Sequence, residues 1–309
     1  MELIEVYDCR SSNCEQLPNW ELLLRSRIGR DVVRRFLDKY LAGTAPEDVS
    51  TRDALAFNIY QLLASHDVGV RYSNSPLGSF PVVDRAESSS TFLDRAESLP
   101  GGIQKLAERV ADSPAVKWWF EPVPMGRWAP RLSTDPDVRT EPDVYGVKPG
   151  SWWSEPVFWR SERGPSTLVV DVIPGLDITV REVTEDEHVR PIELESFKFD
   201  TSIDMSGFNI FEITCPSDWI ELVSRFPRKI DPRKFGAEGV HREKNHLGLD
   251  MQPKWSAVSS NYDGVRLSVG GFATTAYTWL EIDGSTGTQL AGWNPGETVL
   301  FTRPDGEYG

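Results

Sequence analysis

The sequence lacks the features of a membrane or secreted protein. It has no apolar run of about eighteen residues, so we expect no membrane span. Its first residues, Met1 to Val6, carry neither the basic segment nor the apolar stretch of a secretory signal. Cysteine is scarce, and three residues, an odd number, fit a reducing compartment better than a disulfide framework. A cytoplasmic location is therefore expected.

Basic residues are also few relative to acidic ones. The chain has 33 Lys and Arg against 47 Asp and Glu, a net charge of −14. Nucleic acids and anionic membranes attract basic surfaces, so general binding to either is not expected. We expect a protein partner or another macromolecular target instead.

Several motifs of common enzymes are missing. Neither of the glycine-rich phosphate-binding patterns occurs, and no Gly-x-Ser-x-Gly elbow supports a hydrolase triad. Cys9, Cys14, His241 and His246 offer donor atoms of the type that zinc prefers, but the two pairs are loosely spaced and far apart in sequence. We interpret them as unrelated residues and predict no metal site.

The residues that are present indicate a folded chain of the α+β class. Apolar residues make up 39% of the sequence and aromatic residues 11%, including eleven Trp that can serve a core or a binding site. Apolar residues recur at helical spacing over 19–43 and 102–111, and a further helix is expected to begin at Ser50. We therefore predict a helical N-terminal region, 1–112, followed by a domain with a mixed or antiparallel sheet and short helices, 113–309.

Strand patterns dominate the second part. β-branched and aromatic runs predict strands at 116–120, 208–213, 261–269, 276–282 and 296–303. Two runs split by Pro174-Gly175, 167–173 and 176–183, predict a hairpin. Short helices are expected after Cys215 and over 254–260.

The C-terminal strands carry the one functional resemblance. The segments Tyr262-Asp263-Gly264-Val265 and Glu297-Thr298-Val299-Leu300-Phe301 resemble the closing half of ADP-ribosyltransferase domains, over about residues 115–305. That family commonly has Glu-x-Glu or Gln-x-Glu at the start of the late strand, whereas Pro295 stands two residues before Glu297 here. The resemblance implies an NAD-dependent transferase, a toxin or a mobile-element effector, with NAD as its substrate.

The resemblance also implies a set of site residues. Glu297 would be the catalytic carboxylate, which stabilises the oxocarbenium character that develops as nicotinamide leaves. Trp153 and Ser154 would line the nicotinamide pocket, Arg127 would bind a phosphate, and Tyr262 would belong to the cofactor site.

A second interpretation needs no chemistry. The chain would then be an immunity or assembly protein, whose acidic surface binds a basic protein partner by charge complementarity. The two interpretations differ in the expected surroundings of Glu297, which are a cleft with a basic residue and aromatic rings in the first and an open face in the second.

Overall fold

The computed structural model describes residues 17–55, 102–121, 128–131, 154, 156, 167–176, 178–184, 207–230, 250–278, 280–283, 286–290 and 293–301. The helical elements are α2 (Asn19–Arg25), α3 (Arg27–Leu41), η2 (Pro46–Asp48), α4 (Thr51–Leu55), α7 (Gly102–Asp112), α8 (Pro114–Lys117), η3 (Trp118–Phe120), α10 (Val180–Thr184), α11 (Pro216–Arg225), α12 (Trp255–Val258) and α13 (Val269–Thr275). The strands are β1 (Trp128–Arg131), β2 (Thr167–Asp171), β3 (Ile210–Ile213), β4 (Pro227–Ile230), β5 (Asp250–Pro253), β6 (Gly264–Leu267), β7 (Leu280–Asp283), β8 (Thr286–Thr288) and β9 (Glu297–Leu300).

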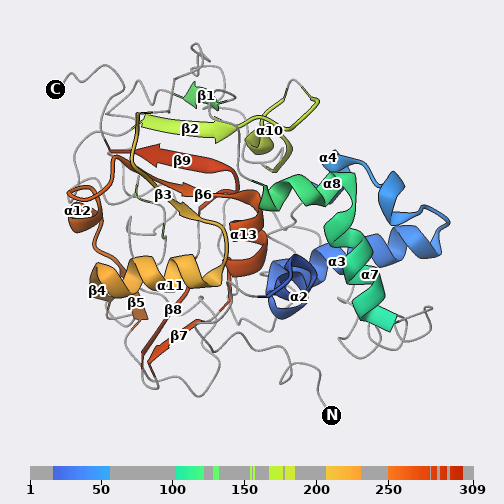
Figure 1. Ribbon diagram of the computed structural model, residues 1–309, viewed down its shortest axis with the longest axis horizontal. Helices are drawn as coiled ribbons and strands as arrows, with labels where there is room; N and C mark the ends of the chain where they lie inside the picture. Colours follow the sequence, from blue (N-terminus) through green and yellow to red (C-terminus); the bar gives the residue numbers. More distant parts are fainter. Residues whose placement is uncertain are drawn as a thin grey trace, which may run out of the picture.

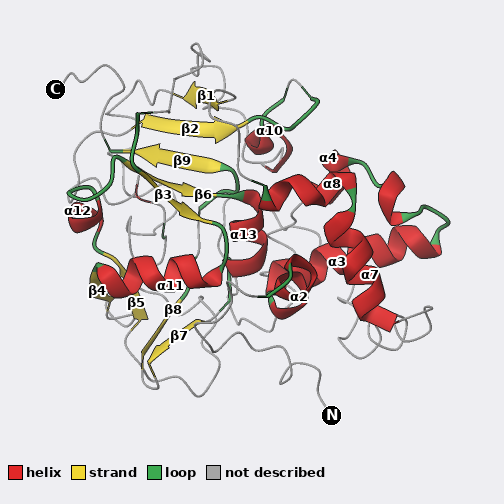
Figure 2. Cartoon of the chain, viewed as in Figure 1, coloured by secondary structure: helices red, strands yellow, loops and turns green. Residues whose placement is uncertain are grey.

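The strands form two mixed sheets, one with the order β1-β2-β9-β6-β3 and the other with the order β4-β5-β8-β7. β3 pairs with β6 in parallel, whereas β9 runs antiparallel to both of its neighbours, β2 and β6. The helices of the first part of the chain, α2, α3, α4, α7 and α8, lie together beside the sheets (Figure 1, Figure 2). The fold is therefore α+β, as the sequence predicts.

The helical part and the sheets share one hydrophobic core. It contains Phe36 of α3, Val110 of α7, Trp219 of α11 and Val299 of β9. The predicted boundary after residue 112 falls between α7 and α8, which contact each other. Burial of large apolar side chains in a common cluster means that the helices are packed onto the sheets rather than loosely tethered to them.

Helix α13 connects the two parts. All seven of its residues are buried, and it contacts α2, α3 and α11. Ser26 donates a hydrogen bond to the carbonyl of Ala273 in α13 at 2.8 Å. Ser26 also accepts from the N–H of Gly29 as the N-cap of α3, and its extended backbone breaks the single helix predicted from residue 19 into α2 and α3.

Several predicted elements are confirmed, and three need correction in addition to the divided helix. The predicted helices over 102–111 and 254–260 correspond to α7 and α12, and the strands at 261–269 and 296–303 contain β6 and β9. The predicted strand at 116–120 is helical, because Pro114 at the first helical position starts α8 and buries Val116 and Trp119 in the core. The predicted strand at 276–282 begins only at Leu280: α13 extends to Thr275, Ala276 forms an isolated bridge with Leu290, and Tyr277 has a φ of +58°, which is not a strand conformation.

The third correction concerns the predicted hairpin. Its turn forms at Pro174-Gly175, with Gly175 at a φ of +77°, and Val172 bridges Thr179. The chain then enters helix α10 at Val180 instead of continuing as a strand. Val180 is fully buried, so the packing of α10 against the core overrides the β-propensity of its two valines.

Gly271 allows α13 to approach β3 closely. A Cβ at this position would overlap the carbonyl oxygen of Ile213, which is backbone and cannot rotate away. We expect Gly271→Ala to lower the free energy of unfolding by about 1–3 kcal/mol, the usual effect of overpacking. Chemical denaturation of the variant measures this loss.

Gly207→Ala is the matched control. A Cβ at Gly207 would meet no atom within 4 Å, so this variant should unfold at the wild-type denaturant concentration. Equal midpoints for Gly271→Ala and wild type would show that α13 and β3 are not in close contact at Gly271.

Candidate functional site

The candidate site is a group of buried charges at one end of the five-stranded sheet. Glu297 is the first residue of the central strand β9, and its side chain is 0% exposed. Arg181 of α10 donates a hydrogen bond from Nη1 to Glu297 Oε1 at 2.9 Å, and Asn294 Nδ2 donates to the same oxygen at 3.1 Å. A guanidinium group and an amide thus hold this carboxylate in place.

A second ion pair lies close by. Arg266 of β6 donates from Nη2 to Asp171 Oδ2 at 2.7 Å, and both side chains are almost completely buried, 2% and 1% exposed. Glu212 of β3, which is 43% exposed, lies 3.4 Å from the other terminal nitrogen of Arg266. Arg266 therefore joins a buried carboxylate to one that reaches the surface.

The two pairs belong to opposite faces of the sheet. Glu297 pairs in register with Val170 and Leu267, whereas Arg266 pairs with Thr298 and Glu212. Side chains alternate along a strand, so Glu297 points to the face of Leu267 and Arg266 points to the other face. The face of Glu297 carries the main core, and the face of Arg266 carries a small cluster that contains Val169 and Leu300.

Gly296 connects the pairs through the backbone. Its carbonyl accepts a hydrogen bond from the Asp171 N–H at 2.8 Å, and its N–H donates to the carbonyl of Leu267 at 2.9 Å. Its φ of +69° is in the left-handed region, and a Cβ there would lie 3.2 Å from Asp171 and Val180. Glycine at this position lets the turn before β9 lie against the end of β2 and the start of α10.

Burial changes the acidity of Asp171. Loss of water around the carboxyl raises its pKa, while the positive charge of Arg266 acts in the opposite direction and only partly offsets this effect. Asp171 Oδ1 is buried and has no hydrogen-bond partner within the described ranges. Removing the charged form from water therefore dominates the pKa of this group.

Of the residues that the sequence predicts for the site, the structure describes Glu297, Ser154 and Tyr262, and it places Tyr262 away from Glu297. Tyr262 precedes β6, and Glu297 pairs with the last residue of β6, so about 15 Å of strand separates them. Tyr262 lies instead against Phe211, with ring centroids 5.2 Å apart, and its hydroxyl accepts from Arg225 at 2.8 Å. The predicted role of Tyr262 in a cofactor site stays a prediction.

The other predicted residues lie elsewhere or outside the description. Ser154 is completely buried and donates to the carbonyl of Gln289 at 3.3 Å, where Gln252 also donates. Arg127 and Trp153 lie outside the described residues, as do Cys9, Cys14, His241 and His246. Their predicted roles stay predictions.

Sequence reasoning missed most of the charged group around Glu297. Arg181, Asp171 and Arg266 were not predicted, although the sequence contained a signal for two of them. Asp171 follows Thr167-Leu168-Val169-Val170, and Arg266 stands between Val265 and Leu267. A charge inside an apolar strand needs an opposite charge nearby, which indicates a buried ion pair.

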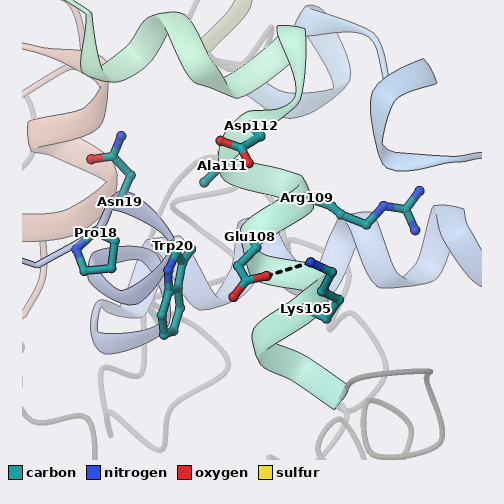
Figure 3. Close-up of a pocket in the computed structure, with 8 residues that line it drawn as sticks. All are labelled: Pro18, Asn19, Trp20, Lys105, Glu108, Arg109, Ala111 and Asp112. Carbon is teal, nitrogen blue, oxygen red and sulfur yellow. Dashed lines mark hydrogen bonds and ion pairs between the residues drawn. The ribbon is translucent and has the colours of Figure 1, made fainter.

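A separate groove lies in the helical part, between α2 and α7 (Figure 3). It has a volume of about 520 Å³ and shares no lining residue with the charged group around Glu297. Trp20 and Glu108 line it, and Lys105 pairs with Glu108 at 3.0 Å. Arg109 also lines the groove and pairs with Glu47 at 2.9 Å.

The raised pKa of Asp171 predicts a pH dependence of stability. Between about pH 4, where the unfolded aspartate titrates, and the raised pKa of the folded state, the folded chain binds more protons. The free energy of unfolding of the wild type, measured relative to Asp171→Asn, should therefore fall as the pH rises through this interval. Denaturation of both proteins at a series of pH values measures the slope. If the free energy of unfolding of the wild type relative to Asp171→Asn rises with pH instead, Arg266 dominates the acidity of Asp171.

Comparison with known proteins does not add a relative. No protein family, curated protein or solved structure matches the chain. None of the helices in the described ranges combines the length and apolar character needed to cross a bilayer. The chemistry of the site itself is therefore the guide to the function.

Proposed function

We propose that the chain is an ADP-ribosyltransferase-like protein that uses NAD as its substrate, with Glu297 as the catalytic carboxylate. The observation that carries the proposal is the place of Glu297, a carboxylate fixed by Arg181 and Asn294 at the start of the central strand β9. The resemblance of the C-terminal strands to this family assigns the catalytic role to a Glu at that point of the fold.

The chemistry that Glu297 would perform is electrostatic. The bond between the ribose carbon and the nicotinamide nitrogen breaks, and its electrons leave with nicotinamide. A nucleophile on the target then forms the new bond to the ribose carbon and loses its proton. A fixed carboxylate beside the ribose accepts a hydrogen bond from a hydroxyl and stabilises the positive charge that develops on the sugar.

Arg181 is suited to bind the pyrophosphate of such a substrate. Guanidinium groups bind phosphate oxygens with two parallel hydrogen bonds, and the side chain of Arg181 is 13% exposed next to a carboxylate. It would accompany Arg127, the residue that the sequence predicts for this task. Because Glu297 itself is fully enclosed, NAD can reach it only after a local movement of the chain.

Glu297→Gln tests the proposal. It keeps the shape of the side chain and removes its charge, so release of nicotinamide from NAD should fall by about 100-fold, the usual effect of losing one such group. Glu221→Gln, in an exposed ion pair with Arg225, is the control and should keep wild-type turnover. Absence of NAD binding to the wild type at millimolar concentration would overturn the proposal.

The complete burial of Glu297 favours a second candidate function, that of a non-enzymatic protein that binds a protein partner. A buried ion pair can hold a fold together without taking part in chemistry. The α2–α7 groove is then the natural place for the partner, because it contains Trp20 and Arg109, residue types that are enriched at interfaces.

A photo-crosslinking residue in place of Trp20 tests this candidate. We expect it to yield a defined crosslinked protein in cells, whereas the same residue in place of Leu176, which is 44% exposed in the turn before α10, should not. Mass spectrometry identifies the product. Equal crosslinking at both positions would indicate random encounter and contradict a docking role for the groove.

A further inference from the structure

Helix α10 closes the site around Glu297. The carboxylate is 0% exposed, whereas Arg181, which contacts it from α10, is 13% exposed. Arg181 therefore touches the enclosed carboxylate with its guanidinium group while part of its side chain reaches the surface. A substrate that approaches the carboxylate from this side has to displace Arg181.

Helix α10 cannot hold this position by itself. It has five residues, and an isolated helix of this length is not stable in water. It follows a tight turn in which the N–H of Ile173 donates to the carbonyl of Ile178 at 2.9 Å. Its place therefore depends on the neighbours against which it packs.

These neighbours come from both parts of the chain. On the sheet side, α10 contacts β2, and Val180 lies against Gly296. On the other side, α10 contacts α4 of the helical region, and Val183 packs on the same core that contains Leu55. Figure 1 shows α10 between the end of β2 and helices α4 and α8.

From this arrangement we propose that α10 is a latch on the Glu297 site and that helix α4 holds the latch closed. This inference rests on the proposed function, and it gives the N-terminal helices a regulatory role. While Arg181 pairs with Glu297, the carboxylate is blocked. Loosening of α4 lets α10 move away and opens the site.

The same contact explains how a substrate would open the latch. Arg181 forms its ion pair with a carboxylate, and a pyrophosphate offers it more oxygens and a greater negative charge. A ligand that carries a pyrophosphate competes with Glu297 for Arg181. The latch therefore responds to ligands that carry a pyrophosphate, and dinucleotides are one such class.

Hydrogen exchange measures the latch without reference to activity. In Arg181→Gln, peptides that contain α10 should exchange at least tenfold faster than in the wild type, while peptides from α11 and β3 keep their rates. Arg181→Lys keeps the positive charge and should exchange at close to the wild-type rate. Arg225→Gln removes an exposed ion pair and is the control, with no expected change in α10.

Leu55→Ala tests the part played by α4. Leu55 is completely buried and distant in sequence from α10, so its truncation should also speed exchange in α10. Leu41→Ala, at a side chain that is 50% exposed, is the matched control. Should Leu55→Ala fail to fold, Arg181→Gln and Arg181→Lys still show whether the Arg181–Glu297 pair holds α10 in place.

NAD turnover separates the latch from the transferase proposal. Faster hydrogen exchange confined to α10, together with faster nicotinamide release in Leu55→Ala, supports both the latch and the transferase proposal. Faster hydrogen exchange confined to α10, without NAD turnover in any variant, retains the latch as a conformational device and overturns the transferase proposal. Unchanged exchange in α10, or an equal increase in all elements, overturns the latch.

Discussion

The structure depends on the pairing of charges that are buried at one end of the five-stranded sheet. An isolated ion in a protein interior is strongly unfavourable, and removal of one partner of a buried pair typically costs about 3–5 kcal/mol. Asp171 and Arg266 satisfy this constraint on one face, and Glu297 and Arg181 satisfy it on the other. The pairs fix the end of β2, the start of β9 and the position of α10 relative to one another.

The N-terminal helices share a hydrophobic core with the sheet that carries these charges. Ser26 hydrogen-bonds to α13, and α4 contacts α10, so the helical region contacts two helices that adjoin the sheet strands. Of these two helices, α10 carries Arg181, the partner of Glu297. A change in the packing of the helices therefore has a direct structural route to Glu297, without the need for a long relay of residues.

The two candidate functions differ in what they require of the enclosed Glu297. A transferase needs the carboxylate to meet its substrate, so Arg181 must give way, and the short α10 is the element that can move. A binding protein needs no such movement, because the same pair then serves stability alone. The α2–α7 groove is spatially independent of the pair, so partner binding there and chemistry at Glu297 can be separated by mutation.

Local sequence patterns were enough to predict the α+β class and several of its elements. α7, α12, β6 and β9 follow from periodicity, caps and turn residues, which act within a few positions of each other. Residues 116–120 and 180–184 look like strands by propensity, yet tertiary packing makes them helical. Local patterns could mark Asp171 and Arg266 as buried charges but not pair them, because Arg181 and Glu297 are 116 residues apart and Asp171 and Arg266 are 95 apart. Only the folded chain decided which charges meet, since the benefit of pairing arises when burial removes both partners from water.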